Sequence, residues 1–174
     1  MIIKIYLFLI LIFISYLIAT AIHEMGHAFF VKFTNNKVIE LRLGKGKKDK
    51  YLFKIGDLEI KRLFFLSGSR CVWSFNNWDN YKKDGILISL GGCIANLVTV
   101  IATLPIGITL AFLEIKLLAY FFLLISSISG YQMLINLLPI KGYDGYNIIK
   151  YNSNSKEFLM KEQNNFKSKY MNEG

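Results

Sequence analysis

The sequence is poor in the residues that form disulfides and metal sites, since only two cysteines and two histidines occur among its 174 residues. Cys71 lies in a basic segment and Cys93 in a long apolar one, so we predict that they form no disulfide. Cys93 is interpreted as a small apolar residue of a helix. Having only two histidines excludes a metal site built from three imidazoles.

Acidic residues are also scarce, with 12 Asp and Glu against 21 Lys and Arg and a net charge of +9. Most basic residues fall between 37 and 83 or between 141 and 169, whereas the connection near residue 115 carries only Glu114 and Lys116. Basic loops of membrane proteins stay on the cytoplasmic side. The pattern therefore predicts a cytoplasmic first loop and C-terminus, an outside N-terminus, and contact with anionic lipid rather than nucleic acid.

Apolar residues, in contrast, make up 53% of the chain and fall in long blocks. Three blocks, at about 5–33, 86–112 and 117–138, can each cross about 30 Å of hydrocarbon as a helix. We predict a mostly α integral membrane protein, located in the cell membrane. Residues 1–150 would form its core of three transmembrane helices, and 151–174 a polar cytoplasmic tail.

The first block also has some features of a cleavable signal peptide, because Lys4 precedes the apolar run and Ala19-Thr20-Ala21 resembles a cleavage site. The run continues past that site to Val31. We therefore predict a span that is retained. In the tail, a short amphipathic helix around 156–163 and disorder are the two alternatives.

Between residues 38 and 66, apolar and polar residues alternate in short runs, a pattern that is typical of strands. Glycines at 44, 46 and 56 supply turns between them. We predict a small membrane-associated antiparallel β-meander between the first two spans. The aromatic segment 73–81 is expected at the membrane interface, because rings with one polar end favour the headgroup layer.

Both histidines fall in one short motif inside the first apolar block, His23-Glu24-Met25-Gly26-His27. On a helix, residues four apart share a face, so both imidazoles can reach one metal ion. Glu24 is placed to take a proton from a metal-bound water. The alternative is a pair of structural histidines. An ionisable residue at the centre of a membrane helix costs about 2.5–3.5 kcal/mol, which favours a functional role.

Catalytic zinc usually takes three protein ligands, and the strongest candidate for the third is Asp144. Pro139 and Gly142 should end the third apolar helix just before this residue. The first and third spans run in the same direction, so their cytoplasmic ends can be neighbours. The alternative is that Asp144 and Gly145 merely form a turn after the helix.

Taken together, these motifs resemble the site-2 protease family of intramembrane zinc metalloproteases. Residues 23–27 match the family's HExxH motif in the first core span, and 136–145 match its Asn-x-x-Pro-x-x-x-x-Asp-Gly motif in the third. Residues 91–97 are similar to its glycine-proline-x-x-asparagine element in the middle span, with Cys93 in place of the proline. The resemblance covers residues 1–150.

The resemblance implies that His23, His27 and Asp144 bind Zn²⁺ and that Glu24 is the general base. It also places Asn96 and Asn136 near the active site, where they would hold substrate or orient the oxyanion. The segment between the first two spans would present an extended substrate by strand addition. The departure at Cys93 alters the local bend of the second span but removes no ligand or base.

We therefore predict an intramembrane zinc endopeptidase that hydrolyses transmembrane or membrane-inserted peptides in the lipid bilayer. The alternative is a zinc-binding membrane scaffold or immunity-type protein without proteolytic activity, against which the presence of Glu24 argues. A metal transporter is a third hypothesis. A transporter would need further polar residues in the other spans, at the same depth in the membrane as the two histidines. The second span offers only Asn96 and small hydroxyls.

Overall fold

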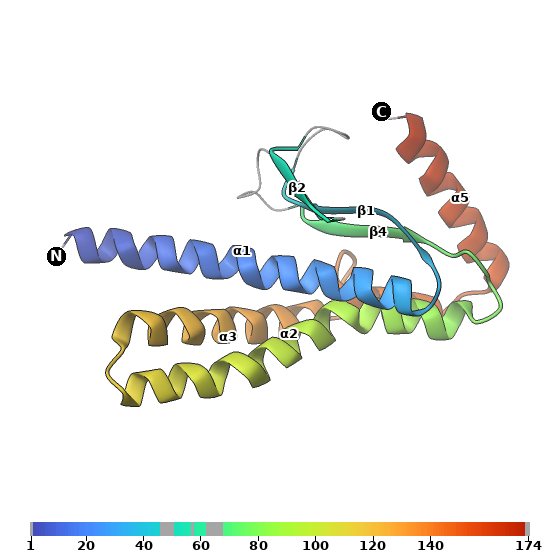
Figure 1. Cartoon of the computed structure of the whole chain (residues 1–174). Coiled ribbons are helices and arrows are strands. Elements are labelled where there is room, and N and C mark those ends of the chain that lie inside the picture. Colours follow the sequence, from blue (N-terminus) through green and yellow to red (C-terminus); the bar gives the residue numbers. More distant parts are fainter. Residues whose placement is uncertain (1, 46–50, 57, 62–67, 173–174) are drawn as a thin grey trace.

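Three long helices lie side by side in the computed structural model, which describes residues 2–45, 51–56, 58–61 and 68–172 (Figure 1). They are α1 (Ile2–Phe33), α2 (Tyr81–Phe112) and α3 (Lys116–Asn136), and α2 packs against both of the others. Each is long and apolar enough to cross a membrane, which confirms the three apolar blocks as candidate spans. The chain is therefore consistent with a membrane protein.

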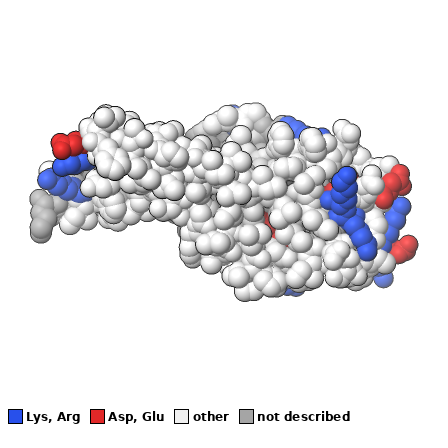
Figure 2. All heavy atoms as spheres, turned by 90° about the horizontal axis from the view of Figure 1, so that it is seen from below, with Lys and Arg blue, Asp and Glu red and all other residues white. Residues whose placement is uncertain are grey.

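The outer surface of these helices has the character expected of a lipid-facing surface. Figure 2 shows charged side chains gathered at the two ends of one face, with an almost uncharged stretch between them. Large apolar side chains such as Ile3, Tyr6, Ile101 and Tyr131 are more than half exposed along the helices. A soluble protein rarely exposes so much contiguous apolar surface, because its contact with water is unfavourable.

A four-stranded sheet covers the C-terminal half of α1 (Figure 1). Its strands are β1 (Lys37–Leu43), β2 (Phe53–Ile55), β3 (Leu58–Ile60) and β4 (Arg70–Ser74), in the spatial order β2-β3-β1-β4. The predicted antiparallel meander is wrong, because β1 pairs with β3 in parallel and with β4 antiparallel. Alternation in sequence indicates where strands occur but does not choose their partners. Residues 46–50, 57 and 62–66 of the predicted meander, which include the predicted turn at Gly46, lie outside the described residues.

The β2–β3 hairpin was expected, and its turn contains Gly56 at a φ of +57°. The sheet buries one apolar face against α1, where Ala28 packs with Leu41, Leu43 and Leu58. This packing accounts for the burial of residues on one side of the C-terminal half of α1, whereas Met25, Phe29 and Phe33 on that half are more than half exposed. Polar residues of α1 that face the sheet are thus shielded from lipid.

Two further helices follow α3, namely α4 (Asp144–Ser153) and α5 (Lys156–Asn172). The predicted end of the third span is confirmed: α3 stops at Asn136, and Pro139 and Gly142 lie in the connection, Gly142 at a φ of +105°. The predicted boundary between core and tail, at residue 150, falls inside α4. Of the two alternatives for the tail, the helix is the one found. It is longer than expected, and Leu159 is buried.

Candidate metal site

Helix α1 presents His23 and His27 on one face, and both side chains are buried beneath the sheet. Their spacing of four residues brings the Nε2 atoms to 3.2 Å from each other, with the ring planes nearly perpendicular. This arrangement points one nitrogen of each ring at a common position, as predicted from the sequence.

Asp144 reaches the same position from the N-terminus of α4. Its Oδ2 atom lies 3.2 Å from Nε2 of His23 and 3.3 Å from Nε2 of His27. The approach depends on Gly145, because a Cβ atom at that position would collide with the backbone carbonyl of Leu137. The turn between α3 and α4 therefore brings the predicted third residue next to both histidines.

These three side chains form a group that could hold a metal ion. Ligand atoms about 2.0–2.1 Å from a tetrahedrally coordinated ion are separated from one another by about 3.3 Å. The observed separations of 3.2–3.3 Å fit that geometry. Burial alone would raise the pKa of Asp144, but hydrogen bonds and positive charge from His23 and His27 lower it to about 2. Its carboxylate is thus ionised and ready to bind a cation.

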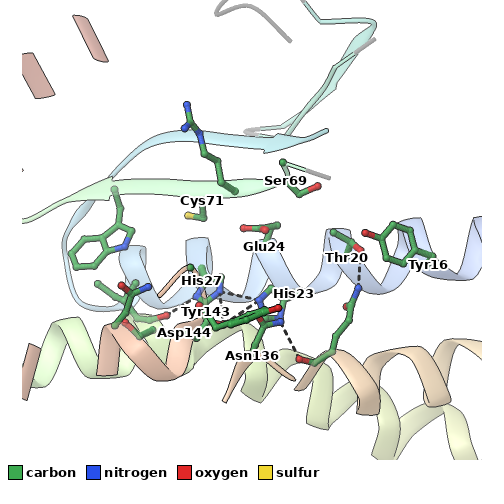
Figure 3. A pocket seen from close by; sticks show the side chains of 18 residues that line it. Tyr16, Thr20, His23, Glu24, His27, Ser69, Cys71, Asn136, Tyr143 and Asp144 are labelled. Carbon is green, nitrogen blue, oxygen red and sulfur yellow. Dashed lines mark hydrogen bonds and ion pairs between the residues drawn. The ribbon is translucent and has the colours of Figure 1, made fainter. Parts of the chain in front are cut away.

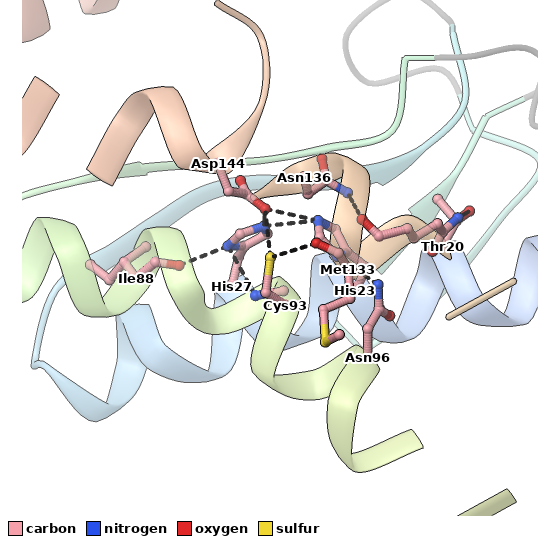
Figure 4. Close-up of polar contacts among 11 residues, drawn as sticks. Thr20, His23, His27, Ile88, Cys93, Asn96, Met133, Asn136 and Asp144 are labelled. Atoms are coloured by element: carbon pink, nitrogen blue, oxygen red, sulfur yellow. Dashed lines mark hydrogen bonds and ion pairs between the residues drawn. The ribbon is translucent and has the colours of Figure 1, made fainter. Parts of the chain in front are cut away.

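The other nitrogen of each imidazole faces α2 (Figure 4). Nδ1 of His27 lies 2.7 Å from the backbone carbonyl oxygen of Ile88, and Nδ1 of His23 lies 3.1 Å from Nδ2 of Asn96. Metal-binding histidines usually form such a hydrogen bond through the nitrogen that does not face the ion, and the bond fixes the ring orientation. Helix α2 therefore supports both rings without contributing one of the three candidate ligands.

Gly92 makes the close approach of α2 to both rings feasible. A Cβ atom at this position would come within about 2.5 Å of Cε1 of His23 and of Nε2 of His27. Such a distance is far below van der Waals contact. A side chain at position 92 would therefore displace the imidazoles from their common position.

Glu24 points away from the two rings, toward strand β4 (Figure 3). The backbone amide of Cys71 in β4 lies within hydrogen-bonding range of its carboxylate. Burial raises the pKa of the Cys71 thiol to about 12, and the nearby charge of Glu24 adds to the shift. Cys71 is accordingly a neutral thiol, and the two cysteines are free, as predicted.

A cavity of about 440 Å³ joins Glu24, His23, His27 and Asp144 to the edge of β4. Its size falls within the usual range for binding sites. Asn136 lines this cavity and donates a hydrogen bond to the carbonyl of Gln132. Asn96 does not line it: this side chain is fully buried behind His23.

Several polar residues of the cavity were not anticipated from the sequence. They are Tyr16, Thr20, Ser69, Arg70, Gln132 and Tyr143. Thr20 accepts a hydrogen bond of 2.8 Å from Gln132, and this bond links α1 to α3 at the wall of the cavity. Thr20 stands three residues before His23, and Gln132 stands four before Asn136. These spacings put Thr20 on the same helix face as His23, and Gln132 on the same face as Asn136, so the sequence could have indicated that both line the cavity.

Cys93 is buried, as expected, but its thiol has a polar environment. Its Sγ atom lies 3.8 Å from Oδ2 of Asp144 and 3.8 Å from the carbonyl oxygen of Met133. A thiol at this distance is a weak hydrogen-bond donor to the carboxylate. The Cys93 thiol thus lies close to a candidate metal ligand.

The sequence matches no protein-family model and no curated protein, and the structure matches no solved structure.

Proposed function

We propose that this protein is an intramembrane zinc endopeptidase of the site-2 protease type, which hydrolyses transmembrane or membrane-inserted peptides. The observation that carries the proposal is the convergence of His23, His27 and Asp144 at the separations of a tetrahedral site, with Glu24 at the wall of the same cavity. Two imidazoles and one carboxylate are the donor set of many catalytic zinc sites, which keep a fourth position open.

Zinc held by these three residues would polarise a peptide carbonyl and activate a water molecule. Glu24 would take the proton from that water and pass it to the leaving amine, because it lines the same cavity as both histidines. Asn136 is placed to donate a hydrogen bond to the developing oxyanion, since its side chain lines the cavity. Burial of the site excludes bulk water and strengthens each of these interactions.

Strand β4 is the proposed binding edge for the substrate backbone. It is an edge strand of the sheet as far as the structure describes the chain, and its amide at Cys71 faces Glu24. A membrane helix must unwind before it can be cleaved, and its freed N–H and C=O groups then need partners. Pairing with β4 would supply these partners and hold an extended peptide along the cavity.

The proposed orientation places the sheet, α4 and α5 on the cytoplasmic side of the cell membrane. The basic residues between α1 and α2 and after α3 support this orientation through the positive-inside rule. Water would enter the cavity from that side, since Asp144 is the first residue of α4, beyond the end of α3.

The proposal is tested with purified protein in liposomes that also contain a pool of single-span peptides. Products are identified by mass spectrometry for the wild type, for Glu24→Gln and for a control, Glu114→Gln, in the connection between α2 and α3. We expect wild type and control to cleave at equal rates and Glu24→Gln to be at least about 100-fold slower, because it lacks the base.

Cleavage at the wild-type rate by Glu24→Gln would refute the assigned base. Stoichiometric zinc in the wild type with no product from any peptide would favour the zinc-binding scaffold over the endopeptidase. Zinc content is therefore measured on the same samples.

A further inference from the structure

The two histidines differ in what fixes the nitrogen that faces α2. His27 meets a backbone carbonyl, that of Ile88, at 2.7 Å. The backbone N–H of Gly92 lies farther from Nδ1, at 3.3 Å. A carbonyl oxygen can only accept a hydrogen bond, so the shorter contact favours a proton on Nδ1 of His27. In a neutral ring Nε2 then has a free lone pair, directed at the other two candidate ligands. The contact with Ile88 thus favours the tautomer of His27 that binds a metal.

His23 instead meets a side-chain amide, whose two ends have opposite hydrogen-bonding character. Nδ2 of Asn96 is directed at Nδ1 of His23, and Oδ1 of Asn96 is buried without a hydrogen-bond partner among the described residues. An NH₂ group donates, so this orientation requires an unprotonated Nδ1. The proton of the neutral ring is then on Nε2, where it can bond to Oδ2 of Asp144 at 3.2 Å.

Metal coordination requires the opposite tautomer of His23. Nε2 must offer its lone pair to the ion, so the proton of the neutral ring must be on Nδ1. Nδ1 then becomes a donor, and the NH₂ group of Asn96 would face it with a second donor. A half-turn of the Asn96 amide resolves this conflict by placing Oδ1 against Nδ1. The ring stays neutral throughout, since Nε2 loses one proton and Nδ1 gains one.

We propose that Asn96 is a positioning residue that rotates its amide to hold His23 in the metal-binding tautomer. Its place on α2 supports this role. Ile88, Gly92 and Asn96 are spaced four residues apart and therefore share one face of the helix. One supplies the fixed acceptor for His27, the second leaves space for both rings, and the third supplies the rotatable partner of His23. Asn96 thereby acts through His23 and has no direct contact with the cavity.

The proposal makes opposite predictions for two substitutions at position 96. Asn96→Leu has a similar volume and no acceptor, so it leaves Nδ1–H of His23 unsatisfied. We expect zinc affinity to fall about 10- to 100-fold, as for loss of other groups that support metal-binding histidines. Asn96→Asp has only acceptor oxygens and favours Nδ1–H, so zinc affinity should equal or exceed that of the wild type. A purely structural role predicts the reverse order, because a buried carboxylate is harder to accommodate than leucine.

Zinc affinity is measured in detergent by competition with a fluorescent chelator. Thr99→Val is the control for loss of a buried polar group on α2, since the Thr99 hydroxyl donates a hydrogen bond to the carbonyl of Ala95 within its own helix. This control should bind zinc within about threefold of the wild type. Equal affinities for Asn96→Leu and wild type, or a loss in Asn96→Asp as large as that in Asn96→Leu, would overturn the proposal.

A second measurement requires neither substitution to fold. The chain has two histidines, so ¹⁵N NMR of the imidazoles gives two ring systems to assign, with His27→Gln identifying His23. In protein stripped of metal we expect His23 protonated on Nε2 and His27 on Nδ1, and with Zn²⁺ we expect both protonated on Nδ1. A His23 ring already protonated on Nδ1 without metal would exclude the amide rotation.

Discussion

Oδ2 of Asp144 lies 3.2 Å from Nε2 of His23, although the two residues belong to helices near opposite ends of the chain. The contact combines three local features of the sequence. His23 and His27 share a face of α1, α3 ends before Pro139, and Gly145 lets α4 begin against the carbonyl of Leu137. Loss of any one of these features would separate the carboxylate from the imidazoles.

The same contact determines how zinc binding should depend on pH. The pKa of Asp144 is lowered to about 2, so its carboxylate stays ionised well below neutrality. A protonated imidazole cannot bind zinc, so protons compete with the ion for both rings. We expect zinc affinity to fall as the pH is lowered, with a slope approaching about 100-fold per pH unit where both rings of the metal-free protein are protonated. Chelator competition at a series of pH values measures the slope.

Asp144→Asn is the informative comparison in that experiment. It should bind zinc more weakly at every pH but retain the same slope, because both imidazoles remain. Constant wild-type affinity down to pH 4, followed by a sharp loss, would instead assign the pH dependence to a carboxylate.

Gly92→Ala should disrupt the site through shape alone. The added methyl group would lie about 2.5 Å from both imidazoles, so the rings must move apart. We expect zinc affinity to fall at least about tenfold, as when the groups that orient a metal ligand are lost. Circular dichroism should show unchanged helix content, since alanine favours helix more than glycine does.

The matched control is Gly130→Ala on α3. A Cβ atom there would make only an ordinary contact of 3.7 Å with Val100. Zinc affinity of this variant should equal that of the wild type. Equal affinities for the two alanine variants would show that Gly92 does not limit the position of the rings.

Cys71 should report the proximity of β4 to Glu24. Its pKa is about 12 because of burial and the Glu24 charge, whereas an exposed cysteine has a pKa of about 8.5. At pH 8 we expect alkylation by iodoacetamide to be about a thousandfold slower than for an exposed cysteine. Mass spectrometry locates the modified residue and follows its rate.

Glu24→Gln removes the negative charge and should make Cys71 more reactive, because less repulsion opposes the thiolate. Glu114→Gln should leave the rate unchanged. A Cys71 rate that is identical in Glu24→Gln and wild type would mean that β4 does not lie over the proposed base.

The sequence was sufficient to predict the three long helices and the convergence of His23, His27 and Asp144. These predictions rest on local signals, namely the length of the apolar blocks, the helical spacing of the histidines and the residues that end α3. The structure agrees with each of them. Strand pairing could not be predicted, because β3 joins β1 in parallel across a connection whose sequence does not specify a partner. Strand β4 was missed for a related reason: its residues, Arg70–Ser74, show little alternation, and it is stabilised by pairing with β1.

The position of Asn96 was likewise beyond sequence analysis. The resemblance implied a polar residue near a proposed active site, whereas Asn96 lies behind His23 and does not line the cavity. Helix α2 packs against α1 with Gly92 at the contact, and this packing puts Asn96 against His23. From this packing we infer that Asn96 supports a candidate ligand and does not contact a bound molecule. Tertiary packing thus decides a role that residue type leaves open.

X-ray absorption spectroscopy of the zinc-loaded protein tests the central claim most directly, because it reports the atoms bound to the ion. We predict one zinc per chain, with nitrogen and oxygen ligands at about 2.0–2.1 Å, two of them imidazoles. The Asp144→Asn variant should lose stoichiometric zinc. A sulfur ligand at about 2.3 Å, which would indicate coordination by Cys93, or fewer than two imidazoles in the wild type, would contradict the assignment of His23, His27 and Asp144 as the metal site.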